Sequence, residues 1–180
     1  GYEIIEGWGL TEAGANNSVN PFHGKKKVGS IGLPMKGTIM KVIDFSGKEL
    51  PDGEEGEIII SGPMLMKGYW NKPKETGEVL KNGWLYTGDV GYRDNEGYFF
   101  ITGRKKDIII KGGENIAPKE IEEVLFTHPK VSEAAVIGVK DDVYGENIKA
   151  FVVLMPGESA DPEELITHCA EKLSKFKLPK

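Results

Sequence analysis

Residues 103–116 read GRKKDIIIKGGENI, and the sequence pattern differs on the two sides of this stretch. Before it, runs rich in β-branched residues, such as 38–44 (TIMKVID) and 57–61 (EIIIS), alternate with turn residues and predict strands. After it, strand-like runs alternate with amphipathic helical patterns. We therefore predict an α+β fold, in which a β-rich unit is followed by a small sheet with flanking helices.

The boundary is expected at the cationic part of this stretch. A hairpin is predicted over residues 91–103 (GYRDNEGYFFITG), with its turn at DNEG. Residues 104–106 (RKK) then separate two strand-like segments, where three charged side chains suit a short solvated hinge. The predicted units are residues 1–103 and 107–180.

Two helices are predicted in the second unit. The first begins near Pro118, because apolar residues from Ile121 onward recur at positions i, i+3 and i+4. The second is predicted over residues 161–176. It has Asp161 at the N-cap position and Glu164 three residues later, which is a complete capping signal.

The composition excludes several classes of protein. The chain has 180 residues, of which 39% are hydrophobic and 28% charged, as in an ordinary globular protein. Its formal net charge of −5 argues against a general affinity for nucleic acid or anionic membranes, and no apolar run approaches the roughly 20 residues of a membrane span. Cys169 is the only cysteine, so an internal disulfide and a cysteine-based zinc site are excluded, and a small buried hydrophobe is expected. No signal peptide is visible, so a cytoplasmic location is expected.

Three turns hold polar residues that packing does not require. Trp8, Thr11 and Glu12 lie in EGWGLTEAG, Asp89 in YTGDVG, and Arg104 at the start of the cationic stretch. Each alone has an ordinary explanation as a helix start, an Asx turn or a solvated cation. Together they suit a nucleotide, which needs a ring against its base, a carboxylate for its ribose hydroxyls, and hydroxyl and cationic donors for its phosphates. Glu12 also suits the magnesium that accompanies a triphosphate.

These stretches resemble the adenylate-forming (AMP-binding) superfamily of acyl-CoA synthetases, luciferases and peptide-synthetase adenylation domains. The resemblance covers essentially the whole chain and rests on four motifs in the family's order. GWGLTE (7–12) is similar to the family's YGxTE, with tryptophan for the usual tyrosine, and residues 56–76 (GEIIISGPMLMKGYWNKPKET) are similar to its GE…G…GY…P…T segment. YTGD (86–89) and GRKKDIIIKGGENIAPKEIE (103–122) complete the set, and the last is similar to the form seen in fatty acyl-CoA ligases.

The resemblance implies that six residues contact the nucleotide or its magnesium: Trp8, Gly9, Thr11, Glu12, Asp89 and Arg104. Thr11 and Glu12 would hold the phosphates and Mg²⁺. Asp89 would bind the ribose hydroxyls, and Arg104 the ribose or phosphate region. Thr11, Glu12, Arg104 and Lys106 would thus act in catalysis.

The resemblance also implies that the chain is the C-terminal part of a longer protein. Residues 1–103 would end the large AMP-binding domain, and residues 107–180 would form most of a small mobile domain. Lys106 matches the hinge position about which this domain swings between two catalytic poses. Gly112 and Gly113 would line the pantetheine path of coenzyme A in the second pose.

The implied function is that of a fatty acid–CoA ligase, which uses ATP to form an acyl-AMP and passes the acyl group to coenzyme A. The implied partners are these small molecules, and a homo-oligomer is allowed. The 180-residue chain alone is expected to be inactive, because the family's phosphate loop and near-C-terminal lysine fall outside it. Three alternatives stay open: an aryl-CoA ligase, an amino-acid-activating adenylation domain, and a non-catalytic nucleotide-binding or interaction module.

Other charged and titratable residues are expected to be structural. His23, His128 and His168 are scattered and do not have the spacing of metal ligands. Residues 25–27 (KKK) are expected in a solvated loop, since no helix start follows them to bind a phosphate.

Overall fold

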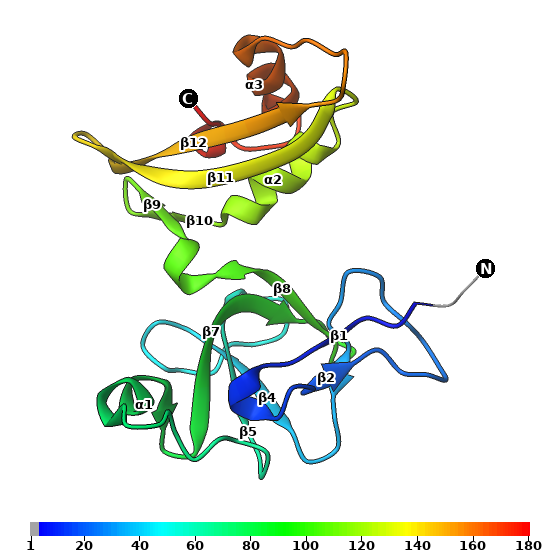
Figure 1. Ribbon diagram of the computed structural model, residues 1–180, viewed down its shortest axis with the longest axis vertical. Helices are drawn as coiled ribbons and strands as arrows, with labels where there is room; N and C mark the ends of the chain where they lie inside the picture. Colours follow the sequence, from blue (N-terminus) through cyan, green and yellow to red (C-terminus); the bar gives the residue numbers. More distant parts are fainter. Residues whose placement is uncertain (1–3) are drawn as a thin grey trace. The chain divides into compact units, whose positions relative to one another are not determined.

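The computed structural model describes residues 4–180, and the chain divides into two compact units, Gly1–Thr102 and Gly103–Lys180 (Figure 1). Each unit has its own sheet and its own hydrophobic core. Both contain strands and at least one helix, so the α+β class predicted from the sequence is confirmed.

A five-stranded sheet forms the centre of the first unit. Its strands are β4 Ile39–Ile43, β5 Gly56–Ser61, β6 Leu80–Lys81, β7 Trp84–Arg93 and β8 Phe99–Arg104. They follow the order β4-β5-β7-β6, and β8 also pairs with β7. The β-branched run Ile58–Ile60 of β5 is buried, with no residue more than 5% exposed. The predicted strands at 38–44 and 57–61 and the hairpin at 91–103 are confirmed.

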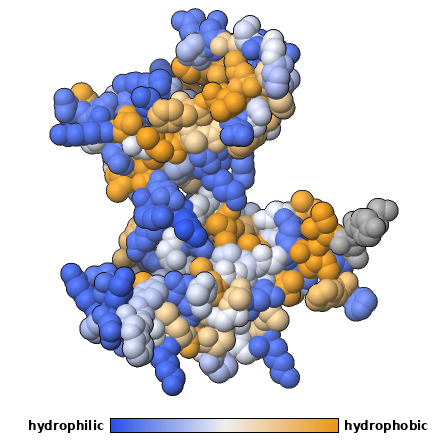
Figure 2. Space-filling view, viewed as in Figure 1, coloured by the Kyte–Doolittle hydropathy of each residue, from blue (hydrophilic) through white to orange (hydrophobic). Residues whose placement is uncertain are grey.

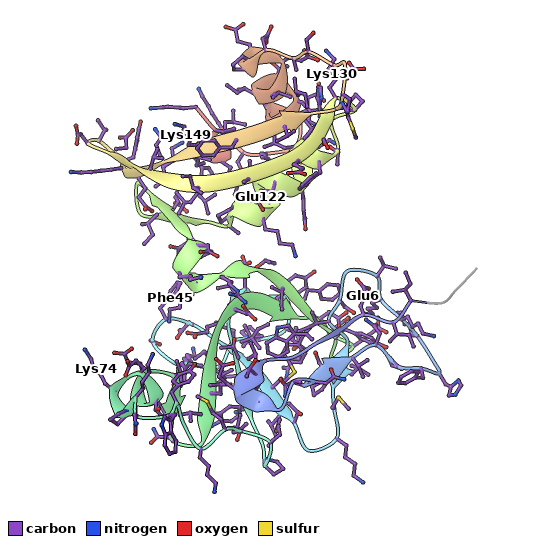
Figure 3. All side chains as sticks on the ribbon, in the orientation of Figure 1. Glu6, Phe45, Lys74, Glu122, Lys130 and Lys149 are labelled. Carbon is purple, nitrogen blue, oxygen red and sulfur yellow. The ribbon has the colours of Figure 1, made fainter. Side chains whose placement is uncertain are left out.

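A small sheet and a short helix complete the first unit. β1 Gly7–Trp8, β2 Ser18–Val19 and β3 Leu33–Pro34 pair antiparallel, and the 3₁₀ helix η1 Thr11–Ala13 lies between β1 and β2. Helix α1 Pro73–Val79, marked by Lys74 in Figure 3, precedes β6. Ala13 is fully buried and belongs to the same core as Phe99 of the main sheet. The turn between β1 and β2 is therefore anchored to the main core.

The second unit is a four-stranded antiparallel sheet with two helices. Its elements are η2 Lys105–Asp107, β9 Ile109–Lys111, β10 Glu114–Ile116, α2 Pro118–Phe126, β11 Val131–Asp141, β12 Gly145–Leu154, α3 Pro162–Ala170 and η3 Lys175–Lys177. The strand order is β10-β9-β12-β11. Ile121 of α2 and Cys169 of α3 are both fully buried in the core that includes Ile148 of β12. Apolar side chains also reach the surface of this unit (Figure 2), among them Phe151 and Val153.

Helix α3 begins as the sequence predicts and ends earlier. The Asp161 carboxylate accepts a hydrogen bond from the Glu164 amide at 2.8 Å, so the predicted N-cap is confirmed. The predicted end at residue 176 is wrong, because α3 stops at Ala170. Ser174 has extended backbone angles, and the Lys180 amide then donates to the Ile148 carbonyl oxygen at 3.1 Å. The chain after α3 therefore leaves the helical conformation before residue 176 and returns to β12.

Two further expectations have clear outcomes. Cys169 is fully buried, as expected of a small hydrophobe, and burial raises the pKa of its thiol. The solvated loop expected at residues 25–27 is wrong for Lys27, whose side chain is 17% exposed and pairs with Asp94 and Glu96. This lysine fastens its loop to the turn between β7 and β8. None of the helices in residues 4–180 is long and apolar enough to cross a bilayer.

Candidate functional site

The turn between β1 and β2 carries two of the candidate residues and is closed by a buried asparagine. Asn17, which is fully buried, donates from Nδ2 to the Ala13 carbonyl oxygen at 2.7 Å, and its Oδ1 accepts from the Leu10 amide at 3.2 Å. One side chain thus supplies partners at both ends of η1. Thr11 is left exposed and Glu12 half-buried on this fixed turn.

The same turn requires glycine at position 9. A Cβ atom on Gly9 would lie 1.4 Å from the Ala15 carbonyl oxygen, a distance that no side chain allows. The Ala15 amide donates to the Leu10 carbonyl oxygen at 2.9 Å, which holds the two segments together. Close backbone approach therefore explains Gly9 structurally, and its contact with a nucleotide stays a prediction.

Glu12 is held by a tyrosine from a distant segment. The Tyr69 hydroxyl donates to Oε1 of Glu12 at 2.8 Å, across 57 positions in the sequence. This hydrogen bond, followed by burial, raises the pKa of Tyr69 above its ordinary value of 10.0, so the hydroxyl is a donor at neutral pH. The Met66 amide also donates to the Glu12 carbonyl oxygen at 2.7 Å. Both the side chain and the backbone of Glu12 are therefore fixed to the segment that precedes α1.

Asp89 projects from a bulge in β7. In the pairing of β5 with β7, the single residue Ile58 lies opposite the three residues 87–89. The Thr87 hydroxyl donates to the Ile58 carbonyl oxygen at 2.6 Å and accepts from the Asp89 amide at 3.0 Å. Gly88 has φ = +73°, a left-handed angle that favours glycine. The bulge therefore takes the Asp89 side chain, which is 3% exposed, out of the regular alternation of the strand.

The bulge brings Asp89 to Trp8. The indole Nε1 donates to Oδ2 of Asp89 at 3.0 Å, although the two residues are 81 positions apart. Trp8 ends β1, and the turn that holds Thr11 and Glu12 starts directly after it. All the candidate residues of the first unit, Gly9 included, thus gather around one turn. The indole N–H edge therefore faces the carboxylate, and the ring also packs against the core of the first unit.

The other candidate residues lie in the second unit and are exposed. Arg104 is the last residue of β8, and Lys106 lies in η2. Gly112 and Gly113 form the turn between β9 and β10, with φ values of 61° and 89° that favour glycine. The Gly112 amide donates to the Tyr144 carbonyl oxygen at 2.8 Å. The roles expected for these four residues, including the hinge at 104–106, stay predictions.

Several residues that support the site were not assigned a role from the sequence. Glu57 is 6% exposed, and its Oε1 accepts from the Gly88 amide at 3.2 Å, inside the bulge. Tyr69 orients Glu12. Both residues belong to the motif at 56–76, whose GE and GY pairs are their only sequence signal. Asn17 has no comparable signal, because its role depends on the closed form of the turn.

The donor set fits a magnesium ion that is held mainly by phosphate. No group of three or more His, Cys, Asp or Glu side chains that could enclose a metal ion is found within residues 4–180. Mg²⁺ typically takes only one or two carboxylates and fills its other positions with substrate phosphates and water. Glu12 offers one half-buried carboxylate, already oriented through Oε1. This arrangement suits a nucleotide-bound cation.

Two of the three histidines meet in the second unit. The rings of His128 and His168 pack edge to face, with centroids 4.9 Å apart. His128 Nε2 lies 3.5 Å from Glu164 Oε1, which also receives Lys130 Nζ at 2.6 Å (Lys130 is labelled in Figure 3). These contacts tie the C-terminal end of α2 to α3, which is a structural role.

The chain matches two family models. Residues 1–70 match the model of the AMP-binding enzyme, and residues 120–180 match that of the AMP-binding enzyme C-terminal domain. Together the two matches account for more than half of the chain.

Known proteins and structures agree with these matches. The chain is 50% identical to a long-chain-fatty-acid–CoA ligase of Bacillus subtilis, over all of the chain and 32% of that protein. It is 48% identical to a sulfoacetate–CoA ligase of Cupriavidus necator, over all of the chain and 36% of that protein. The crystal structure of ATP-bound MatB from Rhodopseudomonas palustris superposes with a TM-score of 0.95 at 40% identity, over 99% of the chain and 36% of MatB.

The chain therefore spans about a third of the length of the relatives it matches. Its sequence motifs, its two family matches and its likeness to an ATP-bound structure all agree, over both units. The chain belongs to the adenylate-forming family of AMP-binding enzymes, and it resembles their acyl-CoA ligases.

Proposed function

We propose that the protein carrying this chain is an ATP-dependent acyl-CoA ligase that activates a fatty acid and transfers it to coenzyme A. The observation that carries the proposal is the hydrogen bond from Trp8 to Asp89 at 3.0 Å. It sets a buried carboxylate and an aromatic ring beside the turn of Thr11 and Glu12, which supports a common site for a nucleotide. The likeness to named CoA ligases supports the class of reaction.

The first unit supplies the groups that would bind the nucleotide. Asp89 would accept hydrogen bonds from the two ribose hydroxyls, because a carboxylate oxygen can accept more than one hydrogen bond. A face of Trp8 would stack on the base. The exposed Thr11 hydroxyl would donate to phosphate oxygens, and Glu12 would ligate the Mg²⁺ that ATP carries.

The second unit supplies cations and a glycine turn. Arg104 would donate to the ribose or phosphate region, since its guanidinium suits phosphate oxygens. Lys106 would lie at the hinge that lets this unit change its pose between the two steps. Gly112 and Gly113, which carry no side chains, would line the path of the pantetheine arm.

The proposed reaction has two steps. A carboxylate oxygen of the acid attacks the α-phosphorus of ATP, the bond from that phosphorus to the bridging oxygen breaks, and pyrophosphate leaves. The sulfur of coenzyme A then attacks the acyl carbon, the bond from that carbon to AMP breaks, and the thiol proton passes to solvent. Bound Mg²⁺ would offset the negative charge that builds up on the phosphates. Thr11 and Arg104 would each donate to the phosphates, so that catalysis would be largely positional and electrostatic.

A fatty acid is the proposed acid, because a long-chain ligase is 50% identical over the whole chain. A sulfoacetate ligase is almost as similar, at 48% identity, which makes other carboxylic acids the rival choice. Aryl acids and amino acids are further alternatives. The 180-residue chain alone should be inactive, because the protein's remaining parts would supply the phosphate loop and the near-C-terminal lysine.

The test is an assay of the full-length protein with ATP, Mg²⁺ and coenzyme A. Palmitate, ferulate, sulfoacetate and an amino acid mixture are offered separately, and both pyrophosphate and the thioester are measured. Palmitoyl-CoA formation is expected. Pyrophosphate release without any thioester would favour an amino-acid-activating domain, and no release with any acid would favour a non-catalytic module.

Two variants and the isolated chain complete this experiment. Asp89→Ala should abolish most of the activity, whereas Asp52→Ala, at an exposed carboxylate that pairs with Arg93, should leave it unchanged. Equal activity in both variants would remove Asp89 from the site. Activity of the 180-residue chain near that of the full protein would contradict its expected inactivity.

A further inference from the structure

Tyr69 connects Glu12 to helix α1 through hydrogen bonds at both of its ends. Its hydroxyl donates to Oε1 of Glu12 at 2.8 Å. Its amide donates to Oγ1 of Thr76, a residue of α1, at 2.9 Å. The backbone and the tip of this tyrosine are therefore both fixed, and its ring bridges two segments of the first unit.

Thr76 is itself fixed by the first turn of α1. Its hydroxyl donates to the Lys72 carbonyl oxygen at 2.7 Å, and its amide donates to the same oxygen at 3.0 Å. The hydroxyl thus directs its proton to Lys72 and a lone pair to the Tyr69 amide, a combination that serine can reproduce and valine cannot. Gly68 permits the close approach, since a Cβ atom there would lie 2.8 Å from Cγ2 of Thr76.

The donor that holds Glu12 is neutral, which suits a carboxylate that must bind a cation. A lysine or arginine in its place would also cancel the negative charge of Glu12 and compete with the cation. The Tyr69 hydroxyl orients the carboxylate without adding charge. Oε1 accepts this hydrogen bond, whereas Oε2 accepts none from residues 4–180. One oxygen is therefore fixed, and the other is left for an external ligand.

We propose that Thr76 and Tyr69 are positioning residues that set the Glu12 carboxylate for the cation carried by ATP. The identity of this ligand rests on the proposed function, and the proposal extends the site to helix α1. Thr76 acts through Tyr69, and Tyr69 acts through Glu12. Neither side chain touches the cation or the nucleotide.

The first experiment measures metal binding directly. Mn²⁺, a paramagnetic substitute for Mg²⁺, is titrated into the full-length protein with saturating ATP and followed by electron paramagnetic resonance. Tyr69→Phe should raise the Mn²⁺ dissociation constant about tenfold, which is the lower end for loss of a hydrogen bond to a charged group. The matched control is Tyr98→Phe. It removes a hydrogen bond of the same kind, from Tyr98 to the Lys25 carbonyl oxygen at 2.6 Å, and should leave Mn²⁺ binding unchanged.

The second experiment separates positioning from packing at Thr76. Thr76→Val keeps the shape but loses the hydroxyl, so it should weaken Mn²⁺ binding as Tyr69→Phe does. Thr76→Ser keeps the hydroxyl and should restore the wild-type value. In steady-state kinetics, the KM for MgATP should rise in Tyr69→Phe and Thr76→Val, while kcat at saturating MgATP changes little.

Several outcomes would overturn the proposal. Equal Mn²⁺ affinity in Tyr69→Phe and Tyr98→Phe would show that the hydroxyl does not set the carboxylate. Equal losses in Thr76→Ser and Thr76→Val would assign Thr76 to packing alone. If the wild-type protein binds no Mn²⁺ in the presence of ATP, the cation is not the ligand of Glu12. Failure of the proposed function would look different, because the wild type would then form no thioester while the metal titration still tested the two residues.

Discussion

Replacing Asp89 with asparagine should remove the negative charge while keeping an oxygen for the Trp8 indole. Asp89 is 3% exposed, and its Oδ2 accepts the indole hydrogen bond at 3.0 Å. Asparagine retains one acceptor oxygen, but its other terminal group is an NH₂ donor that would oppose a ribose hydroxyl. Loss of one hydrogen bond to a charged acceptor costs about 1.5–3 kcal/mol, so the affinity for AMP should fall roughly 10- to 150-fold.

Alanine at position 89 should add a loss of stability to this loss of affinity. It removes both side-chain oxygens and so leaves the half-buried Trp8 N–H without this acceptor, which should lower the free energy of unfolding by about 1–3 kcal/mol. Asp89→Asn should lower it by no more than about 1 kcal/mol, since the indole keeps a partner.

Calorimetric titration of the full-length protein with AMP measures the affinity, and urea unfolding measures the stability. Asp52→Asn, at an exposed carboxylate paired with Arg93, is the matched control and should change neither quantity. The reasoning is refuted if Asp89→Asn binds AMP as the wild type does. It is also refuted if Asp89→Asn and Asp89→Ala lose the same stability.

Three further predictions concern stability and are checked by urea unfolding. Gly9→Ala should lower the free energy of unfolding by about 3 kcal/mol, because its Cβ would lie 1.4 Å from a carbonyl oxygen. The control Gly77→Ala, in α1 with open space around it, should raise the free energy of unfolding by up to about 1 kcal/mol. A mild loss of stability in Gly9→Ala would contradict this prediction. Asn17→Ala should lower the free energy of unfolding by about 1–3 kcal/mol, since two backbone groups of the turn lose their hydrogen-bond partner. An unchanged stability would show that water replaces the asparagine side chain. Hydrogen bonds from the Tyr144 amide, the Asn147 side chain and the Val143 amide lower the pKa of Asp141 from 3.8 to about 2. A lowered folded-state pKa contributes stability that is present above pH 3.8 and is lost as the pH falls toward 2. The wild type should therefore lose more stability over this pH range than Asp141→Asn. Parallel plots of unfolding free energy against pH for the two proteins would contradict this prediction.

Local elements of the fold could be predicted because their signals act over a few residues. The N-cap of α3 is one case, since Asp161 and Glu164 are close in sequence and their hydrogen bond forms as soon as the helix does. The end of α3 could not be predicted in this way. The chain beyond it returns to β12, where the Lys180 amide donates to the Ile148 carbonyl oxygen, a contact that no local pattern encodes.

The candidate site shows the same limit. The family motifs predict Trp8 and Asp89 as members of one site, yet their hydrogen bond spans 81 positions and follows from a bulge whose only sequence trace is Gly88. The contact between Tyr69 and Glu12 spans 57 positions and depends on where α1 packs. Motif resemblance therefore predicts which residues form the candidate site, while their hydrogen-bond geometry requires the folded chain.

The bulge at residues 87–89 has a consequence for how this site can change. The ladder with β5 is regular on both sides of it, at Tyr86 and at Val90. Deleting one residue here would turn every later side chain of β7 to the opposite face and expose the buried Val90, because strand side chains alternate with a period of two. Deleting or inserting two residues would preserve the facing of the strand. The bulged segment can therefore vary in length by even steps while the sheet around it stays intact.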